Sequence, residues 1–322
     1  MSAPTPLRIG TRGSALARTQ TEQVAKRLRE AGVAVTVEVI STLGDRRHDL
    51  PVARLGGDGV FVRELEQALL DGRIDAAVHS LKDLPTAETP GLLLAAIPER
   101  ASPFDAVVGR SAPRLAELPR GATVGTSSIR RVAQLRAIRP DLDIVPLRGN
   151  VDSRLRRLDA GDFDAVILAA AGLERLGLAA RITEVLRPPA FWPAVSQGAL
   201  AIQTRADDAA SRRAVGVVDD AATRAAVVAE RRMLAGLAGG CLAPIGGWAR
   251  IEAEELVLGG RVFDVEEGPE PRSSPAAELR RAWSVDRDDV STSAEALGSA
   301  VAGLLVAQGA NRLIERVRAK DA

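Results

Sequence analysis

The sequence is poor in several residue types that particular classes of protein require. A single cysteine in 322 residues excludes an internal disulfide and a zinc site built from four thiolates. Two histidines make any metal site unexpected. Tyrosine is absent and aromatic residues make up only 2% of the chain, which leaves few platforms for stacking nucleic-acid bases. We therefore expect neither a metal site nor a nucleic-acid partner.

Long apolar runs are missing as well. No stretch approaches the roughly 18 apolar residues of a membrane-spanning helix. The N-terminal segment MSAPTPLRIG lacks the basic start and apolar stretch of an export signal. These absences predict a cytoplasmic protein without a membrane partner.

An excess of charge of one sign is also lacking, since 43 lysines and arginines balance 42 aspartates and glutamates to a net charge of +1. Bulk electrostatics therefore cannot hold a nucleic acid, and any anion site must come from a local cluster. Lys26, Lys82 and Lys320 are the only lysines, so the other 40 cations are arginines, which suit bidentate contacts with carboxylates or phosphates.

The chain does have enough apolar sequence, with 46% hydrophobic residues, to bury a core, and its length suits two or three domains of roughly 100 to 200 residues each. Short apolar strands alternate with helical patterns in its first half, which is typical of parallel βαβ units. A first lobe is expected to contain strands at 6–10, 34–40 and 74–78 and helices at 14–30 and 60–70. A second lobe, starting near Asp105, is expected to contain strands at 106–108, 123–124, 143–147 and 165–168 and helices at 128–138 and 151–158.

The pattern changes in the last third of the chain. A strand at 199–203 can return to the first lobe, which would leave a cleft between the lobes. Beyond it, the expected elements are a helix at 221–237, strands at 248–251, 256–263 and 279–285, and a closing helix at 293–308. We therefore predict three domains: lobe 1 at 1–98 plus 199–217, lobe 2 at 104–193, and a smaller α+β domain at 220–322 that carries the cysteine.

Two of the expected strands end next to charged residues. Lys82 and Asp83 follow a buried strand and precede Pro85, at the edge where open α/β sheets place their ligands. A solvated turn is the simpler interpretation, but a lysine is rare in this arginine-rich chain. Arg130 and Arg131 follow Gly125-Thr126-Ser127-Ser128, where either serine can cap the helix.

Arginines at a helix N-terminus are disfavoured by the helix dipole, so a bound anion would offset that cost; an ordinary capped helix with a basic first turn is the alternative. Other strand ends carry cations too, and any one of them can be a surface charge. These further residues are Arg12 with Ser14, Arg148 with Arg154, and Arg175. If they all lie in one cleft, they favour a ligand with several carboxylates or phosphates.

The only thiol, Cys241, lies in the turn GGCLAPIG between a predicted helix and a predicted strand. A lone cysteine is most often a small buried filler. The flanking glycines, however, allow another group to approach the sulfur closely. A cysteine protease is disfavoured because neither His48 nor His79 lies in a recognisable partner motif.

Seven segments, in order over about residues 7–250, resemble the porphobilinogen deaminases, also called hydroxymethylbilane synthases. They are RIGTRGSALA, FVRELEQALLDGRIDAAVHSLKDLP, GTSSIRR, LRGNVDSRL, AAAGLERLG, SQGALAI and GGCLAPIG. The last 70 residues match only in general character. With the element pattern, the resemblance predicts an α/β fold of two periplasmic-binding-protein-like lobes and a smaller C-terminal α+β domain.

The resemblance implies a dipyrromethane cofactor, built from two substrate molecules and held to Cys241 by a thioether. Four porphobilinogen molecules are then added one at a time with loss of ammonia, and water releases hydroxymethylbilane, a step in tetrapyrrole biosynthesis. The acetate and propionate groups of each pyrrole would explain the arginine-bearing loops. Porphobilinogen is then the small-molecule substrate, and we expect a monomer.

Residue roles follow from the same resemblance. Asp83 matches the catalytic carboxylate, which accepts pyrrole N–H groups and stabilises the cationic azafulvene formed when the aminomethyl group departs. The residues that match cofactor binders are Cys241, Lys82, Asp83, Ser128, Arg130, Arg131 and Arg154. Those that match substrate binders are Arg12, Ser14, Arg148, Arg154, Arg175 and, at the expected lobe junction, Gln197.

The chain departs from the family pattern at two positions. Asp58 and Leu43 replace the basic residues that members of the family often have in the same loop, so we assign that loop no carboxylate-binding role.

Two alternative functions remain open. A two-lobed binding protein or effector domain for a small polycarboxylate would explain the arginines without a covalent adduct on Cys241. A thiol-dependent transferase acting on another acidic substrate would use Cys241 but form no pyrrole adduct.

Overall fold

The computed structural model describes residues 5–41, 62–110, 112–237, 243–265, 274–283 and 287–321. The chain divides into two compact units. Unit 1 comprises Met1–Ala101 and Ala199–Arg224, and unit 2 comprises Ser102–Gly198 and Ala225–Ala322. The division into three domains, with the last 103 residues separate, stays a prediction.

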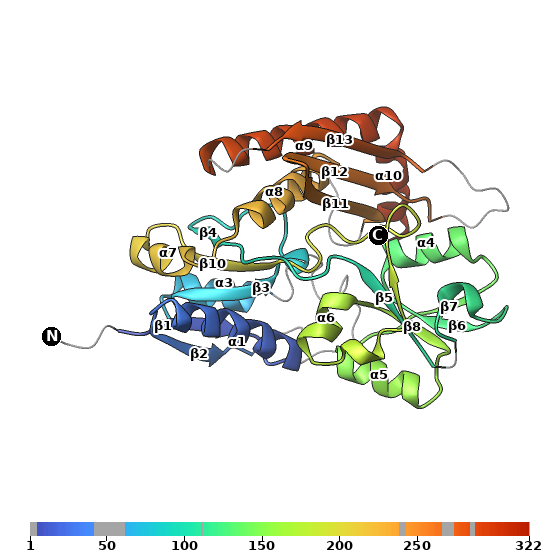
Figure 1. The fold of residues 1–322 in the computed structure, drawn as a ribbon, viewed down its shortest axis with the longest axis horizontal. Helices are drawn as coiled ribbons and strands as arrows, with labels where there is room; N and C mark the ends of the chain where they lie inside the picture. The colour runs from blue at the N-terminus through green and yellow to red at the C-terminus, as the bar shows by residue number, and fades with distance from the viewer. Residues whose placement is uncertain are drawn as a thin grey trace. The chain divides into compact units, whose positions relative to one another are not determined.

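Unit 1 is built on one five-stranded sheet with the order β2-β1-β3-β10-β4 (Figure 1). Strand β1 runs parallel to β2 and β3, whereas β10 runs antiparallel to β3 and β4. The helices and strands of this unit are β1 (Leu7–Thr11), α1 (Ala15–Glu30), β2 (Val35–Val39), α3 (Arg63–Leu70), β3 (Ala76–Ser80), β4 (Leu92–Ala96), β10 (Leu200–Arg205) and α7 (Ala209–Gly216).

Helices cover both faces of this sheet, and each contributes a separate apolar cluster. On one face, Val24 and Leu28 of α1 pack with Ile9 and Ile202 of the sheet. Residues of α3, including Leu65, pack against the other face. Coverage of both faces explains why all but one residue is buried in each of β1, β3 and β10, including the polar Gln203 and Thr204.

The first part of unit 2 repeats this arrangement, with the sheet order β7-β6-β8-β5-β9. Strand β6 is parallel to β7 and β8, and β5 is antiparallel to β8 and β9. Two apolar clusters lie in this part of the chain, one including Leu135 of α4 and the other Leu158 of α5. The elements are β5 (Asp105–Gly109), β6 (Thr123–Gly125), α4 (Ile129–Ile138), β7 (Asp143–Val145), α5 (Val151–Asp159), β8 (Ala165–Ala169), α6 (Ala170–Arg175) and β9 (Glu184–Leu186).

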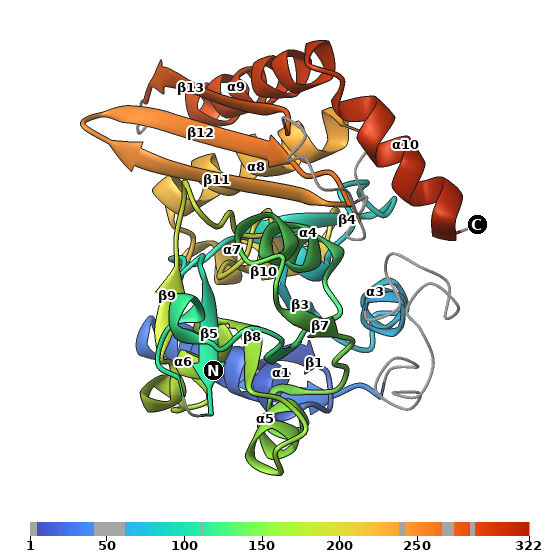
Figure 2. The same ribbon diagram turned by 90° about the vertical axis from the view of Figure 1, so that its right-hand side faces the viewer.

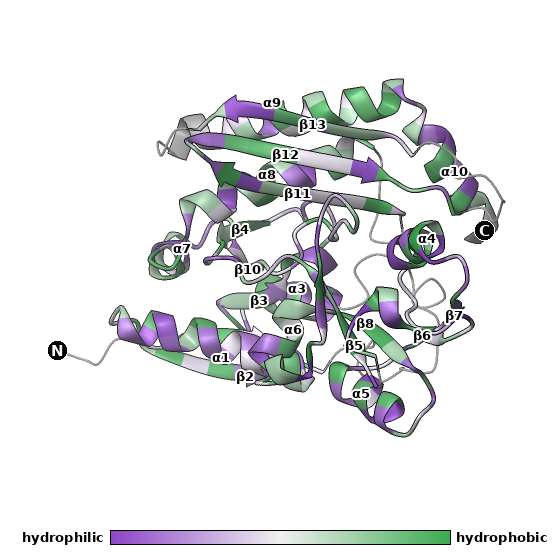
Figure 3. Cartoon of the chain, turned by 45° about the vertical axis from the view of Figure 1, so that its right-hand side comes forward, coloured by the Kyte–Doolittle hydropathy of each residue, from purple (hydrophilic) through white to green (hydrophobic). Residues whose placement is uncertain are grey.

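The C-terminal part is an antiparallel three-stranded sheet, β11-β12-β13, packed with helices (Figure 2). Helix α9 is coloured largely in shades of green in Figure 3, in keeping with its buried residues Leu297, Val301 and Leu305. The elements are α8 (Ala221–Gly236), β11 (Ile245–Glu252), β12 (Glu255–Val262), β13 (Ala276–Ala282), α9 (Arg287–Ala307) and α10 (Ala310–Asp321).

Glycines on β11 and β12 let large side chains approach both faces of this sheet. On one face, a Cβ on Gly247 or Gly260 would come within 2.6 Å of Met233. On the other face, a Cβ on Gly259 would lie 2.5 Å from the Trp192 ring. The loop that carries Trp192 is thereby packed directly onto the C-terminal sheet.

The predicted fold class, two α/β lobes and a smaller α+β part, is confirmed by these three sheets. The placement of the strand near residue 200 in the first sheet is also confirmed. The predicted parallel βαβ units are present in both sheets, and β10 and β5, whose direction was not predicted, are antiparallel to their neighbours. The last predicted strand, at 279–285, begins three residues earlier, at Ala276, and β4, β9, α6, α7 and α10 were not predicted.

Among the described residues, no single helix has both the length and the apolar composition to cross a membrane. In the described part of the chain, one bent pair of helices, Ser291–Ala307 and Ala310–Ala319, is long and apolar enough when the two are taken together, with an angle of 79° between them. Buried core helices have the same length and composition.

Two glycines of α9 give a matched test of the packing of α9 on α8. A Cβ on Gly298 would lie 2.4 Å from the Ala229 carbonyl oxygen, whereas nothing lies within 4 Å of one on Gly303. We expect Gly298→Ala to lower the free energy of unfolding by about 1 to 3 kcal/mol, because backbone must shift. Gly303→Ala should raise it by up to about 1 kcal/mol. Urea unfolding of both variants checks this, and equal effects would contradict the close approach.

Candidate active site

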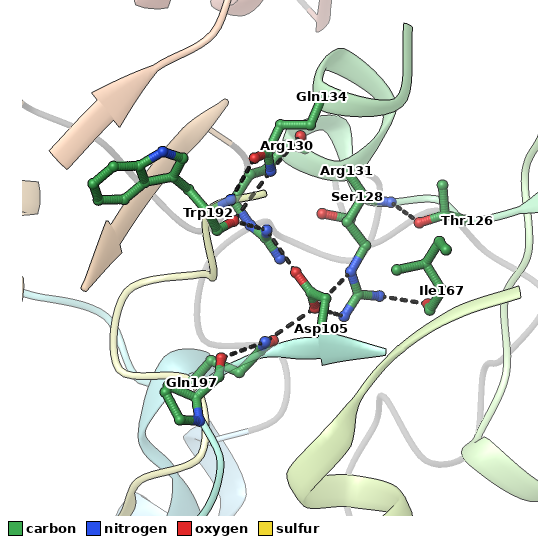
Figure 4. Close-up of polar contacts among 10 residues, drawn as sticks. Asp105, Thr126, Ser128, Arg130, Arg131, Gln134, Ile167, Trp192 and Gln197 are labelled. Carbon is green, nitrogen blue, oxygen red and sulfur yellow. Dashed lines mark hydrogen bonds and ion pairs between the residues drawn. The ribbon is translucent and has the colours of Figure 1, made fainter. Parts of the chain in front are cut away.

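A buried carboxylate, Asp105, joins three of the side chains that the sequence singled out (Figure 4). Asp105 is the first residue of β5 and has no exposed surface. Its Oδ2 accepts a hydrogen bond from Nη1 of Arg130 at 2.8 Å. Its Oδ1 accepts from Nη2 of Arg131 at 2.6 Å and from Nε2 of Gln197 at 3.0 Å. The second and third residues of α4 and a loop 92 residues away from Asp105 are therefore held at one point.

The charges in this cluster do not cancel. Burial alone would raise the pKa of Asp105, but the charges of Arg130 and Arg131, with hydrogen bonds from Arg130 and Gln197, hold that pKa well below its usual range. Asp105 is therefore ionised at neutral pH. Burial lowers the pKa of Arg130, and Asp105 opposes that shift. With both guanidinium groups charged, two positive charges face one negative charge, and the cluster keeps a surplus charge of +1.

Backbone carbonyls also accept hydrogen bonds from both guanidinium groups. Nη1 of Arg130 donates to the carbonyl oxygen of Trp192, and Nη1 of Arg131 donates to that of Ile167 at 2.8 Å. Both of these hydrogen bonds of Arg130, to Asp105 and to Trp192, use the single nitrogen Nη1. The guanidinium groups and the surplus charge suit an anionic ligand.

The start of α4 differs from the predicted cap. Ser128 occupies the N-cap position, but its side chain makes no capping hydrogen bond. The Ser127 hydroxyl donates instead to the carbonyl oxygen of Leu147 at 3.0 Å. The prediction that one of these serines caps the helix was therefore wrong, and the Ser127 hydroxyl binds a distant backbone carbonyl instead. First-turn N–H groups of α4 consequently have no serine cap.

The loop containing Gln197 is held from several elements of unit 2. Glu230 of α8 is fully buried and accepts from the backbone N–H of Ser196 at 2.5 Å and from that of Ala249 at 2.7 Å. Nη2 of Arg175, the last residue of α6, donates to the Gly198 carbonyl oxygen at 2.7 Å. Gln197 is thereby placed next to Asp105 by contacts on both sides of it in sequence.

Two other predicted residues lie at the start of α5. Arg148 is exposed, and Nε of Arg154 donates to the Gly149 carbonyl oxygen at 2.8 Å. Gly149 has a φ of +105°, which strongly favours glycine. The turn thus places Arg148 and Arg154 at the same end of α5.

Unit 1 holds a second set of predicted residues at one edge of its sheet. Lys82 and Asp83 lie in a short 3₁₀ turn, η2 (Leu81–Asp83), directly after β3, as predicted. Arg12 directly follows β1, the parallel neighbour of β3. Both strands end at the same edge, and all three side chains are half-buried. Ser14 caps α1, its Oγ accepting from the Ala17 N–H at 3.3 Å.

Some predicted positions lie outside the described residues, namely Cys241, Leu43 and Asp58. Conversely, the sequence reasoning missed Asp105, Trp192 and Glu230. Asp105 carried one usable signal: it is a carboxylate immediately before an apolar strand, and a carboxylate buried in such a place requires a cationic partner. No comparable signal marked Glu230 within its helix.

Comparison with known proteins gives one consistent family. Residues 7–213 match the family model described as "Porphobilinogen deaminase, dipyromethane cofactor binding domain". Residues 224–305 match "Porphobilinogen deaminase, C-terminal domain". Among curated relatives, the porphobilinogen deaminase of Nocardia farcinica is 51% identical, over 98% of this chain and 90% of that protein. The porphobilinogen deaminase of Acidothermus cellulolyticus is 49% identical, over 96% of this chain and 91% of that protein.

One solved structure with a similar fold is a more distant relation. The methionine-binding protein MetQ aligns with 66% of this chain and 89% of its own chain, at a TM-score of 0.44 and 16% identity. Identity at this level does not bear on what the present chain binds.

A buried histidine beside the unit 1 set makes the stability of the protein depend on pH. His79, on β3, is 6% exposed, and its Nε2 has no hydrogen-bond partner among the described residues. Burial and the positive charge of Arg12 lower its pKa to about 4, although an interaction with Gln203 opposes the shift. The folded protein therefore keeps His79 neutral at a pH where the unfolded chain, with a histidine pKa of about 6.5, binds a proton.

The unfolded state binds more protons between pH 6.5 and 4, so stability falls as the pH drops through this window. We expect His79 to contribute a loss of about 2 to 3 kcal/mol between pH 7 and 4.5. His79→Gln should remove this contribution, and urea unfolding at the two pH values measures it. The wild type and His79→Gln both retain His48 and all carboxylates, so His79 is the only titrating group that differs. If the free energy of unfolding falls equally in both proteins between the two pH values, His79 is not a neutral buried group.

Proposed function

Since this chain belongs to the porphobilinogen deaminase family, we propose that it joins four porphobilinogen molecules to a covalent dipyrromethane primer, releasing ammonia and then hydroxymethylbilane. The chain is an enzyme of tetrapyrrole synthesis, and its substrate is porphobilinogen. The observation that carries the detailed proposal is the buried Arg130–Asp105–Arg131 cluster, with its surplus positive charge, inside the segment that matches the cofactor-binding model.

The residues present suit an acidic pyrrole cofactor. Arg130 and Arg131 are held rigidly, carry one positive charge more than Asp105 neutralises, and keep N–H donors for a further acceptor. Such charge-assisted hydrogen bonds to a carboxylate are stronger than neutral ones, at about 1.5 to 3 kcal/mol each. We assign cofactor carboxylates to Arg130, Arg131, Ser128, Lys82 and Arg154, and the thioether to Cys241. When bound, the cofactor supplies the pyrrole carbon to which the substrate is added.

Incoming substrate would use a partly different set of residues. We assign Arg12 and Ser14 to it in unit 1, and Arg148, Arg154, Arg175 and Gln197 in unit 2. The support is local: Arg12 follows the strand next to the one that leads into Lys82 and Asp83, and Gln197 shares the Asp105 carboxylate with Arg131. Each of these side chains brings a charge or an N–H or O–H donor that suits the acetate and propionate groups of porphobilinogen.

Asp83 is our candidate for the catalytic residue. Its half-buried carboxylate lies in η2, beyond the end of β3, where the backbone N–H of Leu81 donates to the Ala199 carbonyl oxygen at 3.0 Å. A carboxylate in a fixed turn can accept pyrrole N–H groups and stabilise the positive charge that develops on the substrate as ammonia leaves. It can also help to move the proton that the reaction displaces.

Three further assignments complete the proposal. We propose that residues 1–98 with 199–217, 104–193 and 220–322 act as three domains, the last presenting Cys241. We propose a monomer, with neither a nucleic acid nor a membrane as partner. A cytoplasmic location is consistent with the chemistry, since a reducing compartment keeps a single thiol available for the thioether.

The covalent link gives the first test of this function. Intact-mass measurement of the denatured wild-type protein should show an added mass of two linked pyrroles, and peptide mapping should place it on Cys241. Cys241→Ser should lack the added mass and have no turnover, because the hydroxyl is a far weaker nucleophile than a thiolate at neutral pH. An unmodified polypeptide in active wild-type preparations would rule the proposal out.

A second test concerns the charge of Asp83. Asp83→Asn keeps the shape of the side chain but removes its charge, so we expect turnover to fall by about 10² to 10³-fold with an unchanged melting temperature. Asp71→Asn, at the exposed end of α3 in the same unit, serves as the control and should keep normal turnover. Turnover of Asp83→Asn close to that of the wild type would refute the assigned role.

A further inference from the structure

We propose that Asp105 is a positioning residue for this reaction: it aims two arginines at an acid group of the cofactor and shares its carboxylate with the glutamine assigned to the substrate. This inference rests on the proposed function, because it concerns how that site is held. None of the residues that matched the family motifs pointed to Asp105, which emerged only from the geometry of β5 and α4.

The first argument is the division of the carboxylate between its partners. Oδ2 serves Arg130, while Oδ1 serves Nε and Nη2 of Arg131 and the amide of Gln197. Arg131 is held through all three guanidinium nitrogens, because its Nη1 donates to the Ile167 carbonyl oxygen, whereas Nη1 of Arg130 is shared between Asp105 and the Trp192 carbonyl oxygen. Each guanidinium group is therefore held by two acceptors, which limits how far it can turn away from a ligand carboxylate.

The second argument is that the cluster is incomplete as a structural ion pair. A buried pair that only stabilises the fold should have balanced charges and satisfied donors. Here the charge is +1, and the hydrogen bonds that Arg130 donates to Asp105 and Trp192 both come from the single nitrogen Nη1. Asp105 thus neutralises enough charge for two adjacent arginines to be buried, yet leaves one charge for a ligand.

The third argument is that Gln197 depends on the same carboxylate. Its Nε2 donates to Oδ1 of Asp105 at 3.0 Å and to the Pro103 carbonyl oxygen at 2.9 Å. A change at Asp105 therefore disturbs residues assigned to the cofactor and a residue assigned to the substrate together. We expect Asp105 variants to slow cofactor loading and also to raise the KM for porphobilinogen.

The test compares four variants by intact mass, melting temperature and steady-state kinetics. Asp105→Asn should acquire the pyrrole adduct from added porphobilinogen roughly tenfold more slowly than the wild type, because the two arginines then repel each other and lose their common anchor. Asp164→Asn is the matched control. Asp164 is another arginine-paired carboxylate of unit 2, bound to Arg110 and Thr123, and its variant should load within about twofold of the wild type.

Charge balance keeps the experiment informative if Asp105→Asn folds poorly. The double variant Asp105→Asn/Arg131→Gln restores the charge of +1, so it should melt at a higher temperature than Asp105→Asn. If Asp105 acts through the arginines, the double variant loads no more slowly than Arg131→Gln alone. If the double variant loads more slowly by the product of the two single-variant effects, the inference is overturned. It is also overturned if Asp105→Asn folds and keeps the loading rate and the KM of the wild type. A wild-type protein without any adduct would contradict the proposed function itself, and the inference with it.

Discussion

The placement of two adjacent arginines inside the protein depends on one carboxylate. Arg130 and Arg131 are 4% and 7% exposed, and burying two positive charges side by side is unfavourable without a compensating anion. Asp105 supplies that anion, and its pKa is held low against the effect of burial mainly by the charges of the two arginines. Removing one partner from such a buried network typically costs about 3 to 5 kcal/mol. The arrangement is therefore mutually dependent, and α4 can begin at Ile129 only with its first two arginines turned toward β5.

Strand direction explains how Asp105 reaches this position. In unit 2, β6 and β8 are parallel, and the residues that follow them lie at one edge of the sheet. Because β5 is antiparallel to β8, with Asp105 opposite Ala169, the first residue of β5 lies at that same edge. Unit 1 repeats the pattern, since β10 is antiparallel to β3 and Leu200 is opposite Ser80. In both units, one reversed strand brings the residues before it to the edge where the parallel strands end.

This geometry also separates what the sequence could predict from what it could not. Apolar segments and glycine turns located most strands and helices, and motif resemblance located Asp83, Arg130 and Arg131. Pairing direction was not predictable, because a strand buried on both faces has the same apolar composition in either direction. Asp105 was missed for that reason: in an all-parallel sheet, its position would lie at the opposite edge from Arg130. The failed serine cap has a different cause, since the backbone carbonyl that binds Ser127 comes from Leu147, 20 residues away.

The incomplete pairing of the arginines links stability to function. The cluster holds two arginines against one carboxylate, so a charge of +1 stays unbalanced inside the protein, which is unfavourable. A ligand carboxylate at this cluster would balance that charge, so binding the ligand would also stabilise the fold. Any group that binds only the folded state stabilises it in proportion to its occupancy. A covalent link makes that occupancy permanent, and the protein can then keep a charge arrangement that would be unfavourable in a site that is often empty.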